Sequence, residues 1–175
     1  MTIALLAPLL LAAGTADVST LDCPAIAAKT DYTDETDLCL TAPMAKSAYE
    51  EGMTCIGKFD GDRAMAVRLT DLLAEDKREA WAKQIKDNDK FADQLADLAK
   101  RAKEDPDLDP AVGQAAYDTA RAPFDGASTL PGSDQLKIWQ ADAQVSKRCI
   151  EVVNFFDQNL ATRKEERAKN ADSDQ

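Results

Sequence analysis

Three aspartates alternate with other residues in the stretch EDPDLDP, which places Asp105, Asp107 and Asp109 at every second position. Carboxylate oxygens spaced in this way are ligands that Ca²⁺ prefers in loop sites. The rest of the stretch departs from an EF-hand loop, because the sixth residue is Pro110 instead of glycine and the twelfth is Ala116 instead of glutamate. We therefore interpret the three aspartates as a solvated connector between two helices, and we predict no metal site and no cofactor.

The chain contains no histidine among its 175 residues. Histidine is the usual general base near neutral pH and the common partner of a serine or cysteine nucleophile, so those mechanisms are excluded. Most zinc and copper sites, and haem attached through a C-x-x-C-H motif, are excluded for the same reason. Two positioned carboxylates can still hydrolyse a glycoside, but no pair stands out among the 32 acidic residues. We predict that the protein is not an enzyme, and a carboxylate-dependent hydrolase is the least favoured alternative.

The four cysteines are Cys23, Cys39, Cys55 and Cys149, which lie too far apart for a cysteine-only zinc site. An even number of cysteines in an exported chain predicts two disulfides. A helix expected from about 42 to 56 would hold Cys39 and Cys55 at the ends of a rod about 18 Å long. Because a disulfide needs Cα atoms within about 7 Å, these two cannot bond to each other. We prefer the pairing of Cys23 with Cys39, around a small hairpin, and of Cys55 with Cys149.

The first residues have the pattern of a secretory signal. Residues 3–13 form an apolar run, and the small residues Gly14 and Ala16 follow it, although no basic residue precedes the run. The run is shorter than the roughly 20 residues that cross a bilayer. We predict a signal peptide over 1–16, and a periplasmic or secreted protein with no stable membrane insertion after cleavage.

Apolar residues recur at three- and four-residue spacing along the remaining chain, and no segment alternates with period two for the length of a strand. Gly57 is expected to end the first long helix and Asp60 to cap the next one. The region 62–103 should then form one helix or two, with a break in KDNDK at 86–90, because Asn and Asp compete with the helix backbone.

The second half of the chain carries clear helix signals. Asp109 should cap a short helix that begins with a proline and ends at Pro123. The stretch 122–134 is rich in Gly and Pro and is expected to be a loop, after which Ser133 caps a final helix.

These elements predict an all-α, disulfide-tied bundle of about four to five helices. Residues 17–162 would form a single helical domain. The charged stretch RKEERAKNADSDQ at 163–175 would fray into a disordered tail.

The formal net charge of −11 indicates which partners the surface would accept. Such a surface repels nucleic acid and anionic lipid, and it suits a basic protein. An acidic patch in DYTDETD contains Tyr32, Asp34, Glu35 and Asp37. Our first hypothesis is a protein-interaction module, such as an inhibitor or immunity-type factor, that binds a basic partner through these four residues.

Aromatic residues at helical spacing suggest an alternative. Trp81, Trp139, Phe155 and Phe156 would line a pocket if a bundle of this kind left one open, although such residues more commonly form the core. The second hypothesis is therefore a carrier for a small apolar ligand in the bundle core.

Overall fold

The computed structural model describes residues 18–87, 89–142 and 146–173, and the regular structure of these residues is entirely helical. The all-α, disulfide-tied fold class is confirmed, with eight α-helices in the described ranges instead of four or five. They are α1 (Cys23–Ala27), α2 (Asp34–Thr41), α3 (Lys46–Leu69), α4 (Glu75–Asp87), α5 (Asp89–Glu104), α6 (Pro110–Gly126), α7 (Gly132–Asp142) and α8 (Lys147–Ser173). The signal peptide expected over 1–16 lies outside the described residues.

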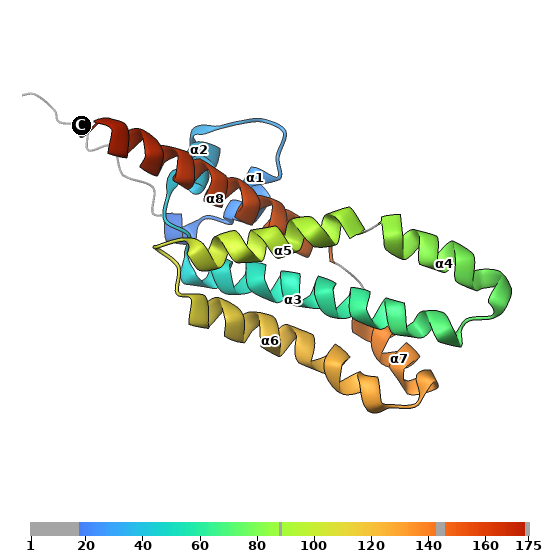
Figure 1. Ribbon diagram of the computed structural model, residues 1–175. Coiled ribbons are helices and arrows are strands. Elements are labelled where there is room, and N and C mark those ends of the chain that lie inside the picture. Colours follow the sequence, from blue (N-terminus) through green and yellow to red (C-terminus); the bar gives the residue numbers. More distant parts are fainter. Residues whose placement is uncertain (1–17, 88, 143–145, 174–175) are drawn as a thin grey trace, which may run out of the picture.

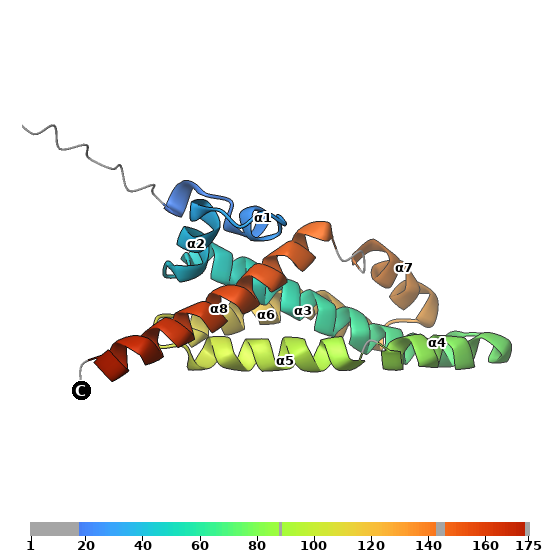
Figure 2. The same ribbon diagram turned by 90° about the horizontal axis from the view of Figure 1, so that it is seen from above.

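The long helix α3 is the central rod of the fold, as Figure 1 shows. Helices α5 and α6 lie along its two sides, α5 antiparallel to α3 and α6 parallel to it. Helix α8 crosses α3 on another face and packs against α1 and α2, whereas α4 and α7 lie at the opposite end of the molecule (Figure 2). None of the described helices combines the length and the apolar character needed to span a bilayer.

Helix α3 continues through Gly57, where the sequence predicted a break, and Asp60 lies inside the helix instead of capping a new one. The reason is packing. A Cβ atom at Gly57 would lie 2.5 Å from the backbone oxygen of Tyr117 in α6, so only glycine lets the two backbones approach this closely. The glycine therefore serves the contact between two helices, and its low helix propensity does not end α3.

Two further glycines continue the contact between α3 and α6. Gly61 of α3 faces the ring of Phe124, and Gly113 of α6 faces the ring of Tyr49, so that a Cβ at either glycine would collide with the aromatic side chain. We call this line of contact the glycine seam. It holds the two parallel helices together over most of the length of α6.

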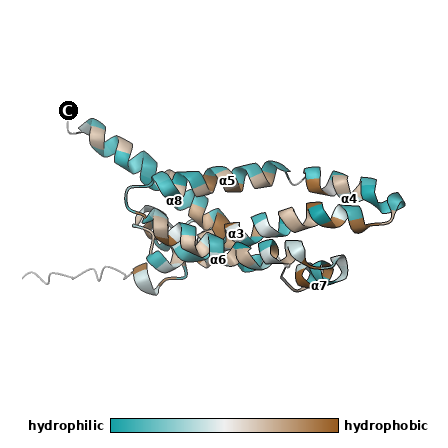
Figure 3. Ribbon diagram, turned by 60° about the horizontal axis from the view of Figure 1, so that its bottom comes forward, coloured by the Kyte–Doolittle hydropathy of each residue, from teal (hydrophilic) through white to brown (hydrophobic). Residues whose placement is uncertain are grey.

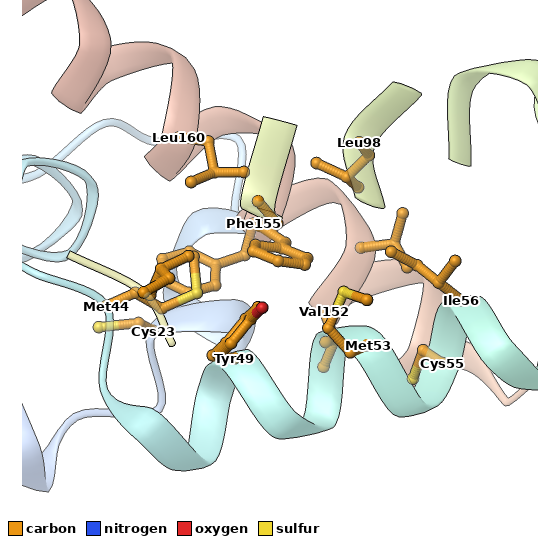
Figure 4. Close-up of a cluster of buried hydrophobic side chains, with 14 of the residues drawn as sticks. Cys23, Met44, Tyr49, Met53, Cys55, Ile56, Leu98, Val152, Phe155 and Leu160 are labelled. Atoms are coloured by element: carbon orange, nitrogen blue, oxygen red, sulfur yellow. The ribbon is translucent and has the colours of Figure 1, made fainter. Parts of the chain in front are cut away.

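The main hydrophobic core lies where α3, α5 and α8 meet (Figure 4). Its members come from distant parts of the chain, and Tyr49 of α3 packs edge-on against Phe156 of α8 with ring centroids 5.9 Å apart. A second, smaller cluster at the other end of α3 contains Met65, Leu69 and Phe124. The bundle is therefore held at both ends of its central helix.

Both disulfides join helices. Cys23–Cys39 connects α1 to α2, and Cys55–Cys149 connects α3 to α8, with Cα atoms 5.4 Å apart in each bond. These are the two pairings that the sequence analysis preferred. The segment between Cys23 and Cys39 forms two short helices joined by a turn, and this turn brings the two cysteines together.

Some helix boundaries agree with the sequence and others do not. The break expected at 86–90 falls on Asn88, which lies outside the described residues. Helix α4 ends at Asp87 before it, and α5 begins at Asp89 after it. Asp109 caps α6 as predicted, since its carboxylate accepts a hydrogen bond from the backbone N–H of Ala111 at 2.9 Å.

The loop expected over 122–134 is largely helical. Helix α6 passes through Pro123 to Gly126, a 3₁₀ turn follows, and α7 begins at Gly132. A proline removes one backbone donor but does not prevent the next turn from continuing. Burial of Phe124 and Ala127 in the second cluster explains why the helix extends beyond the proline.

The C-terminal region also differs from its prediction. The expected single final helix is divided into α7 and α8, and α8 then continues to Ser173, where a disordered tail was expected after Thr162. The last turns project beyond the bundle and carry mostly hydrophilic residues (Figures 2 and 3), which explains why their sequence resembles a tail. Buried ion pairs, described below, fix this part of the helix.

Candidate functional site

The four residues of the predicted acidic patch lie together at the start of α2. Thr33 caps the helix, and Asp34, Glu35 and Asp37 occupy its first turn, where negative charges favourably oppose the positive end of the helix dipole. Tyr32 is 69% exposed and its hydroxyl donates a hydrogen bond to Asp37 Oδ1 at 3.0 Å. This hydrogen bond raises the pKa of the Tyr32 hydroxyl above its ordinary value. The patch is exposed, and stabilisation of α2 is a sufficient structural role for its charges.

Two of the alternating aspartates bind arginines of α8. Asp105 is buried, so the connector is not the solvated segment that the sequence predicted. Arg167 donates to Asp105 Oδ2 at 2.7 Å and to Asp107 Oδ2 at 3.1 Å, and Arg163, which is also buried, forms an ion pair with Asp107. The Arg163 guanidinium lies 3.6 Å from Asp105 as well. We call these four side chains the α8 clamp.

The clamp gives the aspartates a structural role instead of a metal-binding one. Its two carboxylates already accept hydrogen bonds from two guanidinium groups, and the third aspartate, Asp109, caps α6. Among the described residues no group of three or more acidic or cysteine side chains is arranged to hold a metal ion.

The four aromatic residues suggested for a ligand pocket do not share one site. Trp81 and Trp139 pack edge-on, with ring centroids 5.3 Å apart, and join α4 to α7. The indole N–H of Trp81 donates to the backbone oxygen of Ala66 at 3.0 Å. Phe155 and Phe156 are buried in the main core. These aromatic residues therefore hold helices together and do not surround a common space.

A different space is open between α3 and α5. It is a cavity of about 500 Å³, to which Ile85 of α4 and Tyr117 of α6 also contribute. Its apolar walls come from Met53, Ile56 and Phe59 of α3 and from Phe91, Leu95, Ala92, Ala96 and Ala99 of α5. We call it the α3–α5 cavity.

The helical spacing of α5 explains the space. Leu95, Leu98 and Ala102 are the buried residues of α5, and they hold the helix against the core. The alanines at 92, 96 and 99 line the cavity with small side chains. At one end Phe59 and Phe91 meet edge-on, with ring centroids 5.2 Å apart.

Charged residues of α3 border the cavity, and each has a partner within the protein. Asp60 accepts hydrogen bonds from the Tyr117 hydroxyl and from Arg121. Arg63 forms an ion pair with Asp89 at the start of α5. These two contacts join α3 to α6 and to α5, and they leave neither side chain without a partner.

Asp62 is the third charged residue of α3 at the cavity, and its carboxylate accepts a hydrogen bond from the indole N–H of Trp139 at 2.6 Å. Burial raises the pKa of Asp62 above its ordinary value, and the hydrogen bond from Trp139 opposes that rise in part. The carboxylate therefore belongs to the contact between α3 and α7.

The α3–α5 cavity was not predicted from the sequence. The three- and four-residue spacing of apolar residues predicts an apolar stripe in this region and gives no reason to expect an open space beside it. The only available signal was that small residues recur on the face of α5 next to the stripe.

Comparison with known proteins gives no assignment. The sequence matches no protein-family model, and neither a curated protein nor a solved structure matches the chain. The candidate function therefore rests on the geometry described above.

Proposed function

We propose that the protein binds a small apolar ligand in the α3–α5 cavity. The observation that carries this proposal is the open volume of about 500 Å³ between apolar walls. Ligand pockets have volumes of about 300–1,000 Å³ and are lined mainly by apolar side chains with a few polar groups. The cavity meets both criteria.

An exported location is part of the proposal. The two disulfides and the signal-like N-terminal sequence support it, because disulfides persist mainly in oxidising compartments. The intact mass of the protein expressed with its own N-terminus tests this point. A mass that begins at Asp17 supports export, and an uncleaved chain with four reduced thiols contradicts it.

Filling the cavity should abolish ligand binding. The wild-type protein should enhance the fluorescence of the neutral apolar probe N-phenyl-1-naphthylamine with saturation. In Ala99→Leu, a larger side chain occupies the space between α5 and α3, so the affinity for the probe should fall at least about tenfold. The matched control is Ala80→Leu on α4, which is exposed and does not line the cavity.

Two results would contradict the proposal. One is the absence of saturable probe binding by the wild-type protein. The other is equal binding by Ala99→Leu and Ala80→Leu, provided that circular dichroism shows both variants to be folded.

The acidic patch supports a second candidate function, which is a protein-interaction module for a basic partner. The observation that favours it is the exposure of Tyr32 beside three carboxylates. Binding to poly-lysine should weaken steeply with salt, because counterions screen exposed charges. Replacing Asp34, Glu35 and Asp37 by their neutral amides should weaken binding to poly-lysine. The loss should be larger than in a control variant of α4, in which Glu75, Asp76 and Glu79 are replaced in the same way. Equal losses in the two triple variants would show that only the overall charge matters.

A further inference from the structure

We propose that the ligand of the α3–α5 cavity is an amphiphile with one anionic headgroup, of the chemical class of a long-chain fatty acid, and that Lys103 binds the headgroup. This inference rests on the proposed function, because it names the ligand class of the same cavity. Three features of the cavity support it: its charges, its length and the position of the lysine along α5.

The charged residues that line the α3–α5 cavity include one cationic side chain that is available to a ligand. Four charged residues line the cavity, and Asp60, Asp62 and Arg63 are bound to other groups of the protein. Lys103 is the fourth, and its ammonium group forms no ion pair or hydrogen bond with the described residues. Because both carboxylates are already engaged, a cationic ligand would find no free partner among these four residues. A ligand with a single negative charge would complement the free ammonium group.

The position of Lys103 gives the ligand a direction. Helices α3 and α5 are antiparallel, and the contacts Phe59–Phe91 and Arg63–Asp89 fix how they are aligned. Lys103 is the last residue of α5 that lines the cavity, and Phe91 is the first. The headgroup would therefore lie at the Lys103 end, and the apolar tail would extend past the alanines of α5 toward the two phenylalanines.

The length of the cavity suits an unbranched chain. From Phe91 to Lys103 there are twelve residue steps, which correspond to about 18 Å along a helix. An extended alkyl chain advances by roughly 1.3 Å per carbon, so about 14 carbons span this distance. On α5 the residues that line the cavity between Phe91 and Lys103 are all apolar, which suits a chain of methylene groups, whereas the charged residues Asp60, Asp62 and Arg63 border it from α3.

The test compares three ligands of equal chain length that differ only in the headgroup. Myristate, tetradecanol and tetradecyltrimethylammonium would each displace N-phenyl-1-naphthylamine from the protein, at concentrations below micelle formation. Myristate should bind at least about tenfold more tightly than tetradecanol to the wild-type protein. In Lys103→Met, which keeps the apolar stem and removes the charge, this preference should disappear. In the control Lys100→Met, one turn earlier on α5, it should remain.

The outcomes separate the two proposals. If the wild-type protein binds the neutral probe but does not prefer myristate, the inference is wrong and the proposed function stands. The same holds if Lys103→Met keeps the preference, or if the cationic ligand binds most tightly. If the wild-type protein does not bind the probe at all, both proposals are wrong. Lys103 is exposed, so its replacement should leave the unfolding temperature unchanged, and that measurement shows whether the variant is folded.

Discussion

Replacing Cys55 and Cys149 by alanine is expected to lower the free energy of unfolding by about 4–5 kcal/mol. The bond joins residues 94 positions apart and ties α3 to α8, so its loss frees a long loop in the unfolded chain. The matched control is the double replacement of Cys23 and Cys39 by alanine. The Cys23–Cys39 bond closes a loop of only 16 positions, so its loss should lower the free energy of unfolding by about 3 kcal/mol. Urea denaturation of the two double variants measures both values.

The test is the difference between the two double variants in their loss of unfolding free energy. A smaller loss for Cys55/Cys149 than for Cys23/Cys39 would show that native contacts around α1 and α2, and not loop closure, determine the contribution of these bonds. Measured effects of disulfides often fall below the loop-closure value, because the unfolded chain retains structure.

The second large effect is expected at the α8 clamp. Asp105→Asn keeps the shape of the side chain but removes the negative charge beside Arg163 and Arg167. Because the side chains of Asp105 and Arg163 are only 3% and 5% exposed, water cannot replace the lost carboxylate, and the fold should be destabilised by about 3 kcal/mol. Hydrogen exchange should also become faster in α8 after Leu160, since the clamp is what fixes this part of the helix. Urea denaturation and exchange measured by mass spectrometry check the two expectations.

The control for this experiment is Asp107→Asn. The Asp107 side chain is 51% exposed, and the buried Asp105 remains beside Arg163 in this variant, so the expected loss is about 1 kcal/mol or less. If Asp105→Asn costs no more than Asp107→Asn, or if exchange in α8 is unchanged, the clamp does not hold the C-terminal helix.

Features set by neighbouring residues were predictable from the sequence. The cap of α6 depends on Asp109 and the proline after it. The exclusion of a Cys39–Cys55 bond needed only the length of one helix. In each case the residues that allow the prediction lie within a few helical turns of the feature that they determine.

Features set by distant residues were not predictable in this way. Gly57 resembles a helix break until Tyr117, 60 positions later, is placed against it. Arg163 resembles part of a charged tail until Asp107, 56 positions earlier, is placed beside it. The α3–α5 cavity depends on the distance between two helices, which no residue type encodes. The sequence therefore identified the apolar stripes but not the space between them.

The glycine seam has a consequence for how the chain folds. Because α3 and α6 are parallel, the chain must return along the molecule before α6 can begin, and α4 and α5 provide that return. Gly57 and Tyr117 therefore cannot meet through a short hairpin, as neighbouring helices do in an up-and-down bundle. Contacts of such high sequence separation slow folding. We expect the protein to fold more slowly than an up-and-down helical bundle of equal length, a difference that stopped-flow refolding measures. Helix α5, which is part of this return, also forms a wall of the α3–α5 cavity. The slow folding and the open space therefore have the same origin in the topology of the chain.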